Sequence, residues 1–288
     1  MFKNMLVSII VPTCNRNDLL VNCLDLLSPE KQSAGFEYEL IVTDDSKDNQ
    51  ARSLIEQQYP WARWVEGPKS GPAANRNNGA KMARGKWLLF IDDDCLPDVH
   101  ILKEYAAARA ANPDVLVFEG CITVDRPQES FIEESPVNET GGFLWACNFL
   151  MDANLFLNEL KGFDEDFPYA AMEDVDLDYR LKKKQIEVLF VKNAFVVHPW
   201  RMQKKVYEIT MKRFRSLLYF LNKHPEMSKK LGTRYFLHMV YNAVRALGKD
   251  SRRYKFRGFG SRLVYIWLHF YFAIYFLFKQ YTIPAEQQ

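Results

Sequence analysis

Short apolar runs alternate with segments of helical spacing through the first hundred residues. Four apolar runs of six to nine residues, each bounded by polar or turn-forming residues, predict buried strands at 6–11, 38–46, 62–67 and 86–91. The intervening segments predict helices at 18–27, 49–59 and 73–84. Because strands alternate with helices, the pattern indicates βαβ units and an α/β fold with a mostly parallel sheet.

Two of the predicted strands end in carboxylates, Asp44 and Asp45 in one case and Asp92–Asp94 in the other. Adjacent carboxylates repel one another, so either a positive partner or open solvent is expected at the triplet. Ligands of open parallel sheets bind beyond the carboxyl ends of the strands, so both acidic stretches are expected to border one ligand. Asp92 and Asp94 form an Asp-X-Asp motif that suits Mg²⁺ or Mn²⁺ and a diphosphate, although acidic triplets also occur in ordinary loops.

A second acidic cluster opens a predicted helix with Glu173, Asp174, Asp176 and Asp178. One or two acids near a helix N-terminus complement the helix dipole. Four acids in six residues exceed that need, so one of them is a candidate general base.

Histidine and cysteine, the residues that offer nitrogen and sulfur to a metal, are fewer than the acidic residues. His198 follows an apolar run, and a lone histidine is more often structural than a ligand; a metal at the Asp-X-Asp motif would favour the ligand role. The five cysteines are scattered without a CxxC pair, which argues against zinc and against a disulfide framework and is typical of a reducing cytoplasm.

The charge is divided unevenly along the 288 residues, although the net charge is only +2. Residues 1–200 carry 20 Lys and Arg against 32 Asp and Glu, whereas residues 201–288 carry 18 against 4. The basic region ends in a 16-residue apolar run, Leu263–Phe278, interrupted only by His269. That run is shorter than the roughly 20 residues that span a bilayer. An anionic membrane surface is therefore the expected partner, and a helix packed on the preceding α/β region is the alternative.

The sequence gives no indication of nucleic-acid binding or of secretion. The basic region carries no recognised nucleic-acid motif, so no nucleic-acid partner is expected. The first residues, MFKNMLVSIIVPT, lack the long apolar region and cleavage site of a signal peptide. The expected location is the cytoplasm, on the inner face of the cell membrane.

Five segments in order resemble the family 2 glycosyltransferases, which have the GT-A fold: VSIIVPTCNR, YELIVTDDS, GPAANRNNGAKMARGKWLLFIDDDCLPD, GFDEDF and EDVDLDYRL. The resemblance covers about residues 5–200. It implies a Rossmann-like, mostly parallel mixed sheet flanked by helices over residues 1–202, and it leaves residues 203–288 as a helical basic extension. The turn after Asp45 lacks the glycine common in the family, so it is expected to differ.

The resemblance also implies roles for individual residues. Nucleotide and donor contacts are expected from Pro12, Thr13, Asn15, Arg16, Asp44, Asp45, Arg76, Asp92 and Asp93. Metal ligands are expected from Asp94, Asp92 and His198. Asp174 matches the catalytic base, and the acceptor or donor sugar is expected to contact Trp145, Asn148 and Glu173.

The implied activity is inverting, metal-dependent sugar transfer. The donor is expected to be a nucleoside-diphosphate sugar, linked to UDP, and the acceptor a hydroxyl of a saccharide or lipid-linked molecule. The expected pathway is polysaccharide or glycolipid synthesis. A divalent cation is the expected cofactor. A sugar nucleotidyltransferase is one rival, although VPTCNRND lacks the glycine-rich loop that such an enzyme would place after the first strand. An inactive membrane-bound scaffold is the other, although it would be expected to have lost Asp174 or the Asp-X-Asp motif.

Overall fold

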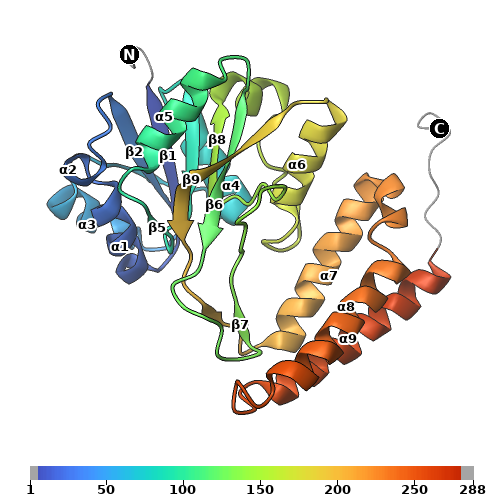
Figure 1. Ribbon diagram of the computed structural model, residues 1–288. Coiled ribbons are helices and arrows are strands. Elements are labelled where there is room, and N and C mark those ends of the chain that lie inside the picture. Colours follow the sequence, from blue (N-terminus) through green and yellow to red (C-terminus); the bar gives the residue numbers. More distant parts are fainter. Residues whose placement is uncertain (1–5, 280–288) are drawn as a thin grey trace. The chain divides into compact units, whose positions relative to one another are not determined.

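The computed structural model describes residues 6–279, which form two compact units (Figure 1). Unit 1 comprises 6–125, Pro136–Asp166 and Glu173–Pro199. Unit 2 comprises Arg126–Ser135, Phe167–Met172 and 200–279.

Unit 1 is built on an eight-stranded mixed sheet in the order β3-β2-β1-β4-β8-β6-β9-β5. Its strands are β1 (Val7–Thr13), β2 (Tyr38–Asp44), β3 (Arg63–Glu66), β4 (Trp87–Ile91), β5 (Leu96–Pro97), β6 (Val117–Thr123), β8 (Asn148–Asp152) and β9 (Val188–Val197). The first four in spatial order are parallel, while β8 runs antiparallel to both of its neighbours. The four strands predicted from the apolar runs are all present, and the α/β class is confirmed.

Helices cover both faces of this sheet because the inner strands are apolar on both sides. Ile9 and Val11 of β1 face the core shared with α1 (Asn17–Leu27), α3 (Gln50–Gln58) and α5 (Ile101–Ala111). Ile10 of β1 faces the opposite core, shared with α4 (Pro72–Lys81), the π-helical segment η1 (Leu155–Glu159) and α6 (Glu173–Lys183). A short helix, α2 (Pro29–Gln32), follows α1. Unit 1 is therefore a three-layer α/β/α sandwich.

Unit 2 consists mainly of helices α7 (Val206–Lys223), α8 (Thr233–Asp250) and α9 (Phe259–Phe278), with the 3₁₀ segment η2 (Pro225–Lys229) between α7 and α8. Aromatic rings join the helices: Phe214 of α7 stacks on Phe272 of α9 with centroids 3.8 Å apart, and Phe236 of α8 stacks on Phe276 at 5.4 Å. Such pairs add to the free energy of burial through their ring electrostatics.

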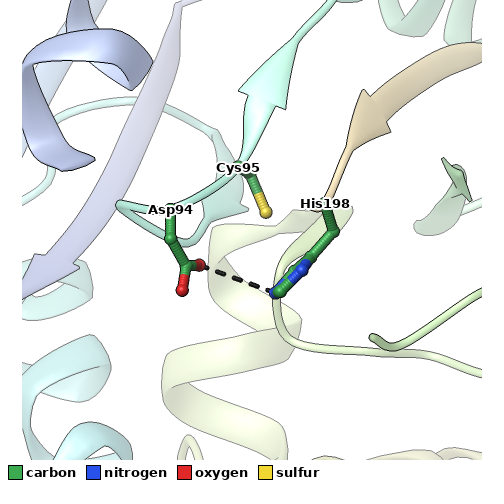
Figure 2. Close-up of side chains that lie close together, drawn as sticks. All are labelled: Asp94, Cys95 and His198. Carbon is green, nitrogen blue, oxygen red and sulfur yellow. Dashed lines mark ion pairs between the residues drawn. The ribbon is translucent and has the colours of Figure 1, made fainter. Parts of the chain in front are cut away.

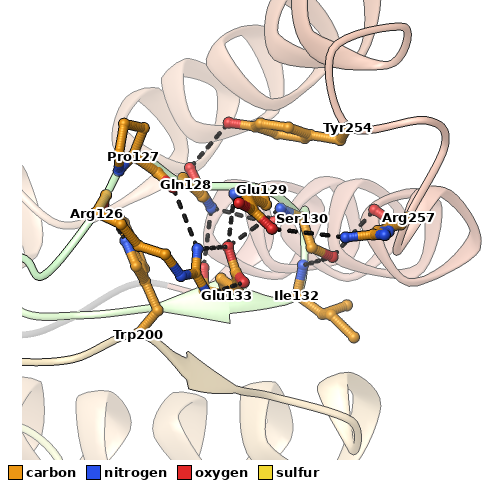
Figure 3. Close-up of polar contacts among 10 residues, drawn as sticks. All are labelled: Arg126, Pro127, Gln128, Glu129, Ser130, Ile132, Glu133, Trp200, Tyr254 and Arg257. Carbon is orange, nitrogen blue, oxygen red and sulfur yellow. Dashed lines mark hydrogen bonds and ion pairs between the residues drawn. The ribbon is translucent and has the colours of Figure 1, made fainter.

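A polar network anchors 126–135 to the rest of unit 2 (Figure 3). The Glu133 carboxylate accepts hydrogen bonds from Arg126, at 2.7 Å, and from the backbone N–H groups of Glu129 and Ser130. Tyr254 donates its hydroxyl to Gln128, and the Ser130 hydroxyl donates to the Arg257 carbonyl. The antiparallel pairing of β7 (Glu133–Glu134) with β10 (Arg201–Met202) also connects 126–135 to the chain that leads into α7.

Helix α9 is longer than the apolar run in the sequence predicted. The apolar run Leu263–Phe278 suggested an element too short for a bilayer, but the helix begins at Phe259 and has 20 residues. By length and composition α9 is able to cross a membrane, and 28% of its most apolar 18-residue stretch is buried. The apolar run alone underestimated the helix because Gly260, Ser261 and Arg262 continue the helical backbone without being apolar.

Candidate functional site

The carboxyl ends of β1, β2 and β4 bring the two acidic stretches to one edge of the sheet. Thr13, the last residue of β1, is in register with Asp44, the last residue of β2. The Asp45 N–H donates to the Thr13 carbonyl at 2.9 Å, and the Thr13 hydroxyl donates to Asp93 at 2.7 Å. Thr13 therefore connects the acids after β2 with those after β4.

Asp44 and Asp45 are both engaged by the protein itself. One oxygen of Asp44 accepts from the Ser46 N–H and hydroxyl, and the other accepts from the Ala51 N–H in the first turn of α3. The Asp45 carboxylate accepts the N–H groups of Lys69 and Gly71 at 2.8 and 3.0 Å. Burial raises the pKa of Asp45, whereas these N–H groups lower it. Asp44 is 1% exposed while Asp45 is only half-buried, so Asp45 is the more accessible of the two.

Two arginines pair with the carboxylates of the acidic triplet. Arg16 lies 2.6 Å from Asp93 and 3.2 Å from Asp94, and Arg76 of α4 lies 2.5 Å from Asp92. These contacts relieve the repulsion expected of three adjacent carboxylates. The positive partners that the sequence required are therefore present within the chain, whatever ligand binds beside them.

Arg76 also links the triplet to the start of α6. Its guanidinium lies 3.8 Å from Glu173 and is almost fully buried. Burial alone would lower the pKa of Arg76, but the charges of Asp92 and Glu173 raise it, so the arginine stays charged. Burial, followed by the neighbouring Glu173 charge, raises the pKa of Asp174 to about 7. A carboxyl with such a pKa is matched to proton transfer near neutral pH.

Asp94 and His198 form the second part of the cluster (Figure 2). His198 Nε2 lies 3.6 Å from Asp94 Oδ1, and both side chains are buried. His198 Nδ1 lies 3.0 Å from the Pro199 carbonyl, which can only accept, so Nδ1 carries a hydrogen. In the neutral ring, the Nε2 lone pair then faces the carboxylate. Two electron-pair donors facing each other fit a divalent cation between them.

Trp145 and Asn148 lie beside this edge but differ in what they can contact. Asn148 pairs with Ile91 where β8 meets the end of β4, so the chain before it, including Trp145, continues past the strand toward the acidic triplet. The Asn148 amide donates to the Cys121 and Ala194 carbonyls and accepts from the Tyr105 hydroxyl. The Trp145 indole N–H is buried without a hydrogen-bond partner among residues 6–279. Trp145 is thus the better placed to meet a ligand.

The remaining expected residues occupy the loop after β1. Pro12 is buried in register with Thr43, so it shapes the strand end. Asn15 is exposed and has a φ of 55°, a left-handed conformation that asparagine tolerates better than most residues. That conformation turns the chain so that Arg16 reaches Asp93 and Asp94.

Two buried groups were missed by the sequence argument. Cys95 directly follows the Asp-X-Asp motif, and its sulfur lies within 4.8 Å of the ligand atoms of Asp94 and His198. Its place directly after Asp94 is a signal that the sequence contains, although Cys95 belongs to no CxxC pair. Glu119 of β6 accepts a hydrogen bond from the Gly142 N–H, and burial raises the pKa of Glu119. No local pattern distinguishes Glu119 from other strand residues.

Curated proteins with similar sequences are glycosyltransferases by name. Validoxylamine A glucosyltransferase of Streptomyces hygroscopicus subsp. limoneus is 24% identical over 301 residues, covering 89% of this chain and 64% of that protein. Poly(ribitol-phosphate) beta-glucosyltransferase of Bacillus spizizenii W23 is 29% identical over 196 residues, covering 64% of this chain and 31% of its own length. The chain thus spans less than two thirds of either protein.

Solved structures share the fold. Staphylococcus aureus TarS 1-349 in complex with UDP superposes with a TM-score of 0.51 at 23% identity, over 74% of this chain and 66% of that one. GalNAc-T7 with UDP, GalNAc and Mn²⁺ superposes with a TM-score of 0.55 at 17% identity, over 69% and 44%. The profile of the family described as Glycosyl transferase family 2 matches residues 8–153, half of the chain, and this stretch contains the first strand, both acidic strand ends and Arg76. The chain therefore belongs to glycosyl transferase family 2.

Proposed function

We propose that the protein transfers a sugar from a nucleoside diphosphate, with UDP as the carrier, to a hydroxyl of a saccharide or lipid-linked acceptor, with inversion at the anomeric carbon. The observation that carries this proposal is the pairing of Asp94 and His198 at one end of the triplet with the Arg76–Glu173–Asp174 group at the other. Surface polysaccharide or glycolipid synthesis is the process that this chemistry serves.

The donor's diphosphate and a divalent cation belong at the triplet. Asp94 and His198 would hold Mn²⁺ or Mg²⁺, with Asp92 as a further oxygen ligand, and the cation would supply positive charge for the leaving diphosphate. Arg16 supplies a second positive charge there, since its side chain is 39% exposed while contacting Asp93 and Asp94. The structure of GalNAc-T7 with UDP, GalNAc and Mn²⁺ supports this combination.

The nucleoside belongs at the ends of β1 and β2, beside Pro12, Asn15 and Asp45. Asp45 keeps partial exposure, so it is proposed to contact the ribose or base, while Asp44 holds the N-terminus of α3 in place. Trp145 offers an indole N–H to a sugar hydroxyl. Asn148 is proposed to position the chain around Trp145, because its hydrogen bonds inside the sheet fix the start of β8.

Asp174 is the proposed general base. As the acceptor oxygen bonds to the anomeric carbon, the bond from that carbon to the diphosphate oxygen breaks, and the hydroxyl proton passes to the Asp174 carboxylate. Glu173 stays close to Arg76, and its charge contributes to the raised pKa of Asp174. One base and one in-line displacement invert the anomeric centre, whereas retention by two successive displacements would need a second nucleophile.

The proposed activity is tested by thermal shift and by product analysis. We expect UDP and Mn²⁺ together to raise the melting temperature by more than the sum of their separate effects, because a cation held by Asp94 and His198 would add positive charge for the diphosphate. Turnover of a panel of UDP-sugars with the matching acceptor should give a product of inverted configuration by NMR. An absence of synergy would argue for the inactive scaffold, and pyrophosphate-dependent formation of nucleotide sugar would support the nucleotidyltransferase.

The pH dependence follows from the environment of Asp174. Its pKa of about 7 leaves it ionised and able to accept a proton above pH 7, and protonated below it. We therefore expect kcat/KM to fall about tenfold per pH unit on the acid side of pH 7. Saturating Mn²⁺ at each pH separates this effect from loss of metal. An acid limb near pH 4 would contradict the role of Asp174.

The unit 2 helices are proposed to rest on the cytoplasmic face of an anionic membrane. One side of α9 is apolar and exposed, with residues that recur at helical spacing: Leu263, Trp267, Phe270, Ile274 and Leu277. Its other side packs on α7 and α8 through Phe272 and Phe276. Because only one side is available, α9 suits the plane of the interface better than a crossing. Basic residues in the last turn of α8 and between α8 and α9 match anionic headgroups: Lys249, Arg252, Arg253, Lys255 and Arg257.

Vesicle flotation tests this attachment. The full chain should float with vesicles containing phosphatidylglycerol, and 1 M salt should weaken the binding, since exposed charges are screened within about 3 Å at that ionic strength. Trp267→Ser combined with Leu277→Ser removes two exposed apolar contacts, 60% and 67% exposed, and should abolish flotation. Tyr207→Ser, at a 57% exposed site on α7, is the matched control. Flotation unchanged in the double variant would refute the attachment.

A further inference from the structure

The thiol of Cys95 has no part in the proposed sugar transfer, yet it lies against the proposed metal ligands (Figure 2). Its sulfur, a carboxylate oxygen of Asp94 and a ring nitrogen of His198 all lie within 4.8 Å of one another, and all three residues are buried. Oxygen, nitrogen and sulfur donors thus converge on one small volume.

The backbone brings Cys95 close to His198. In the antiparallel pair of β5 and β9, Leu96 is in register with Val197, and Cys95 and His198 directly adjoin this last pair of the ladder. The Cys95 N–H also donates to the Asp92 carbonyl at 3.1 Å, which closes the turn between the triplet and β5. The three donors are therefore placed by the main chain rather than by flexible side chains.

This donor set differs from what Mg²⁺ or Mn²⁺ prefers. Those cations favour oxygen ligands, whereas a thiolate with an imidazole suits Zn²⁺, Co²⁺ or Cd²⁺. Donors around a tetrahedral Zn²⁺ lie about 3.3–3.7 Å apart, given bonds of about 2.0–2.3 Å. The Asp94–His198 separation of 3.6 Å already meets this requirement, and the sulfur, which lies within 4.8 Å of both atoms, needs to approach each by at most about 1.5 Å.

We propose that Cys95 is a sulfur ligand which gives this site a second, thiophilic mode of metal binding. Binding of Zn²⁺ forms a metal–sulfur bond and releases the thiol proton to solvent, with Asp94 Oδ and His198 Nε2 as the other protein ligands. No oxidation or reduction is involved. Zn²⁺ held in this way excludes the hard cation, so it inhibits sugar transfer; only this consequence rests on the proposed function.

Spectroscopy with Co²⁺ tests the ligand directly, without donor or acceptor. Titration of the full chain in a Cys14→Ser background, which removes the exposed thiol, should produce a thiolate-to-cobalt charge-transfer band in the near ultraviolet and release a proton. Cys95→Ser should eliminate the band and weaken Zn²⁺ binding at least about tenfold, while leaving Mn²⁺ binding unchanged. Cys147→Ser is the matched control, since Cys147 is buried and hydrogen-bonded to Cys95 but lies outside the donor group.

Three results would overturn the proposal: no band in the Cys14→Ser protein, a band that survives Cys95→Ser, or a band lost only in Cys147→Ser. X-ray absorption of the Zn²⁺-loaded Cys14→Ser protein provides a measurement that does not depend on the folding of a Cys95 variant. It should show one sulfur at about 2.3 Å, and a shell of only oxygen and nitrogen would also refute the ligand. A cobalt band in a protein that transfers no sugar would leave the metal site standing and refute the proposed function alone.

Discussion

Asp174→Asn is expected to lower kcat for sugar transfer by roughly 10²–10⁴-fold, because it removes the group that takes the acceptor proton. Asparagine has nearly the same shape but cannot accept a proton at neutral pH. The Asp174 carboxylate accepts a hydrogen bond from the backbone N–H of the adjacent Val175, which an asparagine oxygen can also accept. The loss should therefore appear in kcat, measured with saturating donor and acceptor, while the thermal shift with UDP and Mn²⁺ is retained.

Asp178→Asn is the matched control for this variant. Asp178 lies one turn further along α6, and burial raises the pKa of Asp178 as well, but its carboxylate is paired with Lys182. Its replacement should leave kcat within a few-fold of the wild-type value. Equal losses in the two variants would show that the charge of α6, rather than one base, supports the reaction, and an active Asp174→Asn would remove Asp174 from the mechanism.

Arg76→Met is expected to lower the free energy of unfolding by about 3–5 kcal/mol, because it leaves the buried carboxylates of Asp92 and Glu173 without their shared cation. The guanidinium is 7% exposed, and the two carboxylates are 18% and 8% exposed, so solvent screens these charges weakly. Methionine fills a similar volume and keeps the apolar packing of the stem. Urea unfolding monitored by circular dichroism measures the change.

Lys81→Met provides the comparison within the same helix. Lys81 is 65% exposed and lies 3.9 Å from Glu165, so its loss should not measurably change the stability. Adding Asp92→Asn and Glu173→Gln to Arg76→Met should recover part of the lost stability by removing the uncompensated charges. A stability of Arg76→Met within about 1 kcal/mol of wild type would mean that solvent or relaxation compensates the buried acids.

Much of unit 1 was predictable because its strands are local patterns. The apolar runs ending at Thr13, Asp44 and Ile91 mark β1, β2 and β4, and the rule that ligands bind beyond parallel strands placed their acids at one edge. The helical spacing of the segments between the strands gave the helices at 18–27, 49–59 and 73–84. The family resemblance added Arg76 and singled out Asp174 among the acids that open α6. The antiparallel strand β8 and the two-residue strand β5 lacked such patterns, because their pairing depends on partners distant in the chain.

The sequence by itself determined the α/β class, the acidic strand ends, the family and the separation of a basic, aromatic C-terminal region. Those properties follow from residue order, since hydrophobic period and charge are read along the chain. Only the tertiary structure decided that Arg16 and Arg76 pair with the triplet, that the Asn148 amide is hydrogen-bonded inside the sheet, and that Cys95 lies close to His198. These contacts join residues up to about one hundred positions apart, and no local pattern specifies which polar groups will share a buried volume once strands and helices pack.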